Sequence, residues 1–214
     1  MRAPLIVVIL AVVAAGGYYF FQRQTSALPE VVETASAQSA APVRPSDGAA
    51  LTVFNDICID GRANYAQTES RALAAGWSLA SDDVNPNVAR IMSISRGASV
   101  PQASEIVINA YAHPERPQFI VLTGMNLAGN PVNGCYVYDF AAPGLPELSP
   151  FETSLGAPTE IVSEPGVIDS KKWVRPALFP SVATLRMGYF PPGSPAEPQV
   201  GYSGLVLALT SMSR

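Results

Sequence analysis

The residues best suited to chemistry are few and widely separated. The chain holds a single histidine, His113, in the segment AHPERP, and two cysteines, Cys58 and Cys135. An imidazole can act as a general base, and two thiols can form a disulfide, bind a metal or exchange electrons. Each role needs neighbouring groups at a defined spacing, so the surrounding sequence decides among them.

The two cysteines, Cys58 and Cys135, are predicted to form a structural disulfide. The chain has no C-x-x-C motif, and it lacks the histidines that would complete a structural zinc site. An isolated pair in an exported protein is normally oxidised, and closing so long a loop stabilises the fold by about 4 kcal/mol. Ile57 and Ile59 flank Cys58 and supply no cation that would lower a thiol pKa. The alternative interpretation is two buried free thiols that pack as small apolar residues.

His113 is expected in a turn between two strands, because prolines stand on both sides of it. A serine hydrolase would need a motif such as G-x-S-x-G, and residues 201–205 lack the second glycine in register. One alternative function is nevertheless a small exported hydrolase, whose site is assembled from scattered residues such as His113, Asp139 and Glu152. Sequence alone does not bring these three together.

A calcium loop is suggested by Asp83, Asn85 and Asn87, which match the pattern D-x-N-x-N. The match ends there, because Val88 replaces the turn glycine and Ile94 replaces the bidentate glutamate. We therefore expect an Asx-rich turn. No glycine-rich phosphate-binding motif is present either, so the sequence predicts no cofactor.

Lys171, Lys172, Trp173 and Arg175 form the one local cluster of basic and aromatic residues. Such a cluster can meet anionic lipid head groups or an acidic partner. The favoured interpretation is the solvated edge of a short strand, where lysines oppose aggregation. The formal net charge is −4 and only 14% of residues are charged. This composition predicts no nucleic-acid partner.

The N-terminal residues predict a membrane anchor. Ala3–Phe21 carries no charge, and as a helix it spans roughly the ~30 Å hydrocarbon core of a bilayer. We interpret residues 1–23 as a single-pass signal-anchor in the cytoplasmic membrane. Residues 24–50, rich in alanine, proline and serine, are predicted to be a disordered tether to an exported domain at 51–214. The alternative is a cleaved signal peptide, with small residues at Ala15 and Gly17 before the cut.

Apolar periodicity predicts an α+β domain with a mainly antiparallel sheet. Two helices are expected within 51–75, although 51–59 also has strand-forming residues, and a later helix follows Ser149 and Pro150 and ends at Gly156. The helices are expected to pack on strands at 88–95, 105–112, 118–123, 135–140, 172–176, 183–190 and 204–212.

These expectations point to a membrane-anchored domain on the periplasmic or extracellular side. We expect a non-catalytic binding or interaction module, which contacts the lipid bilayer through its N-terminal helix and meets an envelope protein partner. An exposed apolar surface would favour this function. A cluster of perturbed acids beside a pocket would favour the hydrolase.

Overall fold

The computed structural model describes residues 48–62, 64–81, 83–97, 100–174, 176, 179 and 182–212. The predicted anchor at 1–23 and most of the predicted tether at 24–50 lie outside these ranges. Within them, no helix is both long enough and apolar enough to cross a bilayer.

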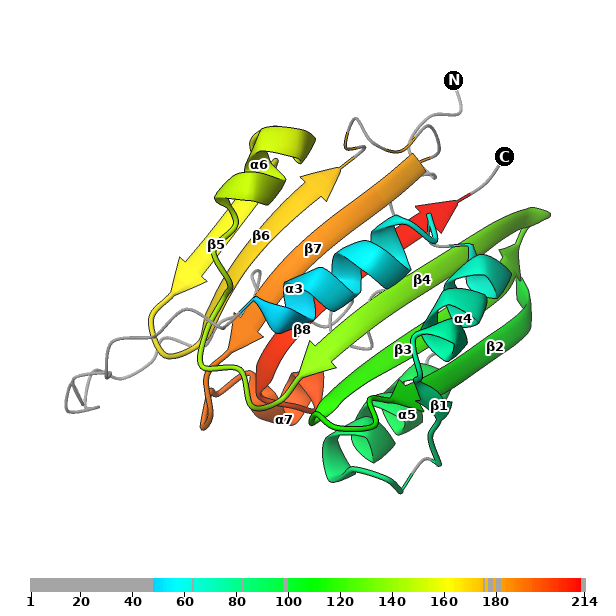
Figure 1. Ribbon diagram of the computed structural model, residues 1–214, viewed down its shortest axis with the longest axis horizontal. Helices are drawn as coiled ribbons and strands as arrows, with labels where there is room; N and C mark the ends of the chain where they lie inside the picture. Colours follow the sequence, from blue (N-terminus) through cyan, green and yellow to red (C-terminus); the bar gives the residue numbers. More distant parts are fainter. Residues whose placement is uncertain are drawn as a thin grey trace.

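One sheet organises the described residues (Figure 1). Its strand order is β1-β2-β3-β4-β8-β7-β6-β5, and every neighbouring pair is antiparallel. The strands are β1 (Ser78–Leu79), β2 (Ala103–Ala112), β3 (Gln118–Leu127), β4 (Asn130–Asp139), β5 (Glu160–Glu164), β6 (Ile168–Val174), β7 (Val182–Phe190) and β8 (Gly204–Met212). The predicted antiparallel sheet with packed helices is confirmed, and the sheet is the dominant part of the fold.

Helices cover both faces of this sheet (Figure 1). One face carries α3 (Ala49–Val53), the π-helix η1 (Phe54–Ile59), α4 (Tyr65–Ala74) and α6 (Ser149–Leu155). We call it the α4 face. The opposite side, the α5 face, carries α5 (Pro86–Gly97) and α7 (Glu197–Val200). The predicted N-terminal helical pair and later helix are present, and the helices on the α5 face were not expected.

The first helical segment forms because its apolar residues recur on one side. Phe54 and Cys58 are buried at this spacing, so the strand interpretation of 51–59 is wrong. The backbone N–H of Asp60 bonds the carbonyl of Asn55 at 3.0 Å, which is the longer ladder of a π-helix.

A glycine then allows the chain to turn back into α4. A Cβ on Gly61 would lie 2.4 Å from the carbonyl oxygen of Ile57 and 2.5 Å from Oγ1 of Thr68. Only glycine permits this close approach. The side chain of Asn64 then accepts a hydrogen bond from the backbone N–H of Gln67 at 3.1 Å and caps α4.

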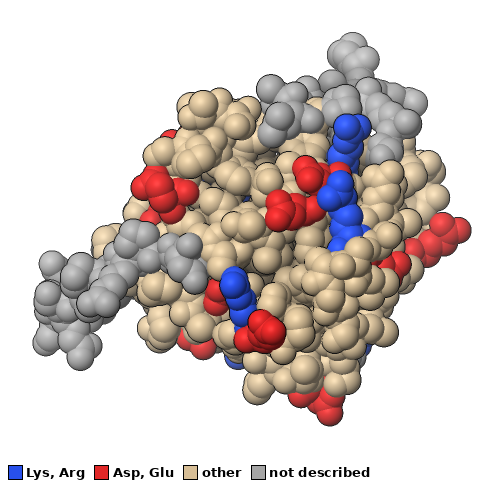
Figure 2. All heavy atoms as spheres, in the orientation of Figure 1, with Lys and Arg blue, Asp and Glu red and all other residues tan. Residues whose placement is uncertain are grey.

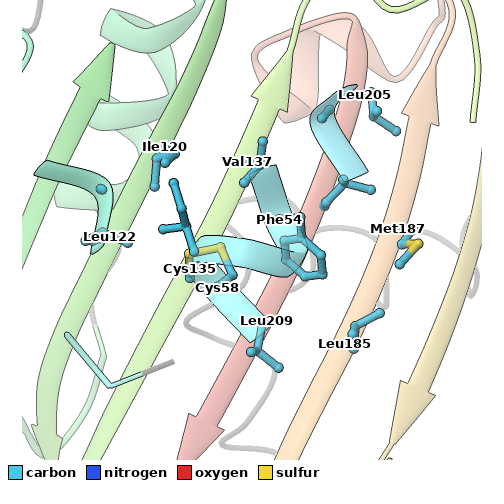
Figure 3. Packing of buried hydrophobic residues seen from close by; sticks show 14 of the residues in the cluster. Phe54, Cys58, Ile120, Leu122, Cys135, Val137, Leu185, Met187, Leu205 and Leu209 are labelled. Atoms are coloured by element: carbon cyan, nitrogen blue, oxygen red, sulfur yellow. A yellow bond between two sulfur atoms is a disulfide. The ribbon is translucent and has the colours of Figure 1, made fainter. Parts of the chain in front are cut away.

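The disulfide joins η1 to the centre of the sheet. Cys58 and Cys135 are bonded, with their Cα atoms 5.6 Å apart, and both are fully buried. Figure 3 shows the sulfur atoms among apolar side chains from η1, β3, β4, β7 and β8. The predicted pairing is confirmed, and Trp77 belongs to the same apolar cluster as Cys58.

The two faces of β8 supply two different cores, as its alternation predicts. Leu205, Leu207 and Leu209 face the α4 layer, whereas Val206 and Ala208 face the α5 layer. The second core contains a group of aromatic rings in contact, formed by Phe119, Tyr138, Phe140, Phe190 and Tyr202. The sheet centre is thus covered on both sides.

The predicted strand at 88–95 is wrong, because these residues lie in α5. Val88, Ile91 and Met92 are the buried positions, and this spacing belongs to a helix. Asn85 and Pro86 precede them as a helix start: the side chain of Asn85 accepts the N–H of Asn87 at 2.8 Å. The prediction followed the weak alternation of apolar residues within VARIMSIS, which is typical of a strand.

Other elements differ from prediction mainly at their ends. β3 and β4 extend further into the predicted turn, leaving only 128–129 between them. In α6, Ser149 is the first helical residue instead of the N-cap, and its hydroxyl bonds Glu147. Gly156 ends α6 as predicted, with φ of 80°. β5 and α7 were not predicted.

Candidate functional site: an open sheet edge

His113 lies in the turn after β2 and has structural partners. Its Nδ1 accepts the backbone N–H of Glu115 at 3.0 Å, and its ring meets Trp77 edge-on at 5.0 Å. Its backbone N–H bonds the carbonyl of Gln118. These contacts hold the turn against the α4-face core.

Asp139 lies at the same end of the sheet as His113, but Gln118 stands between them. The carboxylate of Asp139 accepts Nε2 of Gln118 at 2.9 Å and the N–H of Ala141 at 3.1 Å. His113, Gln118 and Asp139 follow one another across β2, β3 and β4. The Gln118 amide therefore occupies, by its hydrogen bond, the carboxylate that a catalytic histidine would need as its partner.

Glu152 lies in another part of the sheet. It belongs to α6 and pairs with Nζ of Lys171 at 2.7 Å. Lys171 is on β6, and β8 and β7 separate β6 from β4. This order places β6 roughly 14 Å from β4 at the usual strand spacing. The structure therefore places His113 and Asp139 at one end of the sheet, whereas Glu152 lies elsewhere and forms an ion pair with Lys171.

The basic and aromatic residues on β6 point in different directions. Lys171 reaches Glu152 on the α4 face, whereas Lys172 reaches Glu160 at 2.8 Å on the other. Trp173 is buried, and its Nε1 donates to the carbonyl of Gly156 at 2.9 Å. The predicted strand edge is wrong, because β5 and β7 flank β6. Arg175 lies outside the described residues.

The Asx-rich segment was expected to be a turn before a strand, and it instead leads into α5 as a helix start. Asn85 provides the capping oxygen described above, and Val88 is a buried residue of α5 itself. Asp83 is exposed, and a hydrogen bond from Ser81 lowers the pKa of its carboxyl. Within the described ranges, no three His, Cys, Asp or Glu residues are grouped to hold a metal ion.

A polar network that sequence reasoning missed joins α4 to β2. Nδ2 of Asn109 donates to the hydroxyl of Tyr65 at 2.7 Å, and the hydroxyl of Tyr111 donates to Glu69. Burial is the largest cause that raises the pKa of both phenols. Gly124 makes room for this network, since a Cβ there would lie 3.2 Å from the Tyr65 ring. The network fixes α4 over β2.

Beyond this network, β2 forms an incompletely covered edge of the sheet. β1 pairs only with Tyr111 and Ala112, and Ala80 adds one bond to the carbonyl of Ala110. Among the described residues, 103–109 pair with β3 alone. We call Ala103–Asn109 the open β2 edge.

The backbone of Ile108 points out of this edge. His113 bonds Gln118 and Ala80 bonds Ala110, so from Val107 to His113, beyond the irregularity in the register, odd-numbered residues face β3 and even-numbered ones face outward. The N–H and C=O of Ile108 therefore face away from β3, and neither has a partner among the described residues.

Apolar side chains accompany this unpaired backbone. Ser104, Glu105, Ile106 and Val107 are all exposed in succession. Ile106 keeps 48% and Val107 keeps 45% of its surface exposed, which is unusual for two adjacent β-branched residues. Leu79 on β1 is also exposed and continues the apolar surface past the open edge.

A β-bulge interrupts the same strand. Ser104 pairs with Asn126 and Val107 with Gly124, so two residues of β2 stand opposite one of β3. Glu105, within the bulge, has φ of 54°. A non-glycine residue rarely adopts this conformation, and such strain concentrates at functional positions.

Charges on the α4 face are sparse. Figure 2 shows that most of its Lys and Arg side chains lie beside Asp or Glu, with broad uncharged surface between them. Arg71, 3.5 Å from Asp60, is one such pair.

No family model, no curated protein and no solved structure matches the chain.

The sequence contains a signal for the open edge, but an incomplete one. EIVIN places apolar residues at consecutive positions, as in a strand buried on both faces. Strand order decides whether these residues are buried or exposed, and local sequence does not encode it.

Proposed function

We propose that the protein is an interaction module exposed to the cell envelope, and that it binds a partner through the open β2 edge. The observation that carries this proposal is that the backbone of Ile108 has no partner among the described residues, beside the exposed side chains of Ile106 and Val107. Natural proteins usually shield such an edge, because it invites pairing with another chain. An edge that is both unpaired and apolar favours a binding role.

The expected anchor and tether belong to this proposal. A signal-anchor at 1–23 would hold the domain at the outer side of the cytoplasmic membrane. Residues 49 and 50 belong to α3, and a flexible segment over 24–47 would have an r.m.s. reach of roughly 27 Å. The domain would then contact an envelope protein without leaving the membrane.

Photo-crosslinking in the native membrane tests the proposal. A photoreactive amino acid at Val107 of the full-length protein is predicted to give a discrete adduct with another protein after irradiation. Ile161, which is 61% exposed on the opposite edge strand β5, is the matched control position and is predicted to give none. Equal labelling from both positions, or no adduct from Val107, would contradict the proposal.

A further inference from the structure

The chain already adds one strand to this edge. β1 is only a two-residue strand, Ser78–Leu79, and it pairs antiparallel with the last residues of β2. The bond from Ala80 to Ala110 is the final one of that ladder. Ile108, with its outward N–H and C=O, is the next position to which such a ladder would extend. The edge is thus suited to main-chain pairing at the point where β1 stops.

The side chains beside Ile108 have the alternation that an added strand needs. Val107 shares the α4 face with Asn109, whereas Ile108 packs toward the α5-face core. Strand addition takes its affinity from main-chain hydrogen bonds and its specificity from alternate side chains. An apolar residue of the incoming strand would cover Val107.

Glu105 supplies a charge criterion for the incoming strand. Its side chain is exposed, and it forms no ion pair with any described residue. Opposite charges across neighbouring strands stabilise a sheet, and like charges destabilise it. A lysine or arginine near Glu105 is therefore the complementary residue.

The same carboxylate argues against a second copy of this chain. Two-fold pairing centred on Ile106 would set each Glu105 opposite Val107 of the other copy. The two carboxylates would then occupy neighbouring diagonal positions and repel each other. The bulge at Glu105 further opposes pairing of two identical edges.

We infer that the partner supplies an extended polypeptide segment, which adds as a strand beside Ala103–Asn109 and carries a basic residue that meets Glu105. This inference rests on the proposed function and specifies its partner. The ladder would end at β1, so the added segment would be about as long as the open edge, roughly 23 Å at ~3.3 Å per residue.

Peptide binding to the full-length protein tests strand addition. The probe is a dye-labelled eight-residue peptide that alternates valine with threonine and includes two lysines, measured by fluorescence anisotropy. N-methylation of its four central amides removes main-chain donors and is predicted to weaken binding at least tenfold. The control peptide carries its extra methyl groups on side chains and keeps every amide N–H, so it should bind. No binding of the parent peptide, or binding insensitive to N-methylation, would overturn the inference.

A charge reversal tests the role of Glu105. Glu105→Lys is predicted to weaken binding of the lysine peptide about two- to fivefold and to strengthen binding of a glutamate version by a similar factor. Glu164→Lys, an exposed acid on β5, is the matched control and should change neither. Equal effects of the two substitutions would overturn the charge assignment.

The crosslinking and peptide results separate the two proposals. If Val107 yields a partner adduct and the peptides fail, the interaction surface stands and the added strand is wrong. If the adduct from Val107 is a second copy of this chain, the hetero-partner inference is overturned. If Val107 yields no adduct, the proposed function itself fails.

Discussion

The central strands and the open β2 edge show how one sheet combines two opposite environments. β3, β4 and β8 have neighbours on both sides and helices on both faces, and the disulfide fixes η1 to β4. Within the described ranges, the open β2 edge has one neighbouring strand, and it carries a bulge and two exposed β-branched side chains. Substitutions in the centre should therefore change stability, and substitutions at the edge should change binding.

The opposite edge sharpens this contrast. β5 spans only Glu160–Glu164 and begins and ends with a carboxylate. Glu160 also pairs with Lys172 and lies 3.7 Å from Arg186. Short, charged edge strands resist pairing with other chains. Ile161 is exposed there, but the apolar residue next to it, Val162, is half-buried, and its same-face neighbours Ser163 and Lys171 are polar.

The largest expected loss of stability comes from removing the disulfide. The bond links residues 77 apart in sequence, and replacing Cys58 and Cys135 by alanine should lower the free energy of unfolding by about 4 kcal/mol. Urea denaturation of the full-length protein measures this loss. Crosslinking from Val107 should persist in the folded fraction, because neither thiol lies at the edge. Loss of the adduct without loss of stability would show that the disulfide has a direct role in binding.

A cavity at the sheet centre should cost slightly less. Leu207 is fully buried on β8, and Leu207→Ala should lower the free energy of unfolding by about 3 kcal/mol. Leu79→Ala is the matched control, since Leu79 is 64% exposed, and its effect should stay within about 0.5 kcal/mol. Similar losses from both variants would show that the edge contributes to the core.

Buried phenols in the centre should make the fold sensitive to alkali. Burial, with Tyr202 and Tyr136 nearby, raises the pKa of Tyr138 well above its ordinary range. A raised pKa means that the folded state keeps a proton which the unfolded chain releases above about pH 10, so stability falls as pH rises further. Tyr138→Phe should flatten this alkaline decline. The free energy of unfolding is measured by urea denaturation at steps of about one pH unit between about pH 9 and 12. An unchanged slope would assign the decline to other groups.

The smallest effect on stability should come from the edge itself. Val107→Lys keeps an exposed side chain exposed, so it should change the free energy of unfolding by less than about 0.5 kcal/mol. It should nevertheless abolish partner capture, assayed with a photoreactive residue at Ile106. Ile161→Lys should alter neither quantity. If Val107→Lys destabilises the protein strongly, the edge is part of the structural core.

The parts of the fold that local patterns encode could be predicted. β8 alternates between two cores, EIVIN forms a strand, and Gly156 ends α6. The disulfide could be predicted because the sequence around the two cysteines contains no metal-binding or redox motif. In each case, neighbouring residues carry the whole physical signal.

The parts that depend on strand order could not be predicted. The alternation in VARIMSIS competed with a helical spacing, and in the fold the helical positions are the buried ones and Asn85 caps the helix. Lys171 and Lys172 looked like an edge because β5 was not foreseen. The polar network of Tyr65 and Asn109 joins residues distant in sequence, so no local motif reports it. The open β2 edge became visible only once its neighbours were known.

Residue-resolved amide hydrogen exchange on the full-length protein tests the central claim most directly. The N–H groups of Val107 and Asn109 face β3, whereas that of Ile108 faces away from it. The account predicts slow exchange at Val107 and Asn109 and exchange at least a hundredfold faster at Ile108. It also predicts that Ile108 gains protection when the lysine peptide is bound. Equal protection at all three amides in the free protein would contradict the account, because the edge would then already be paired.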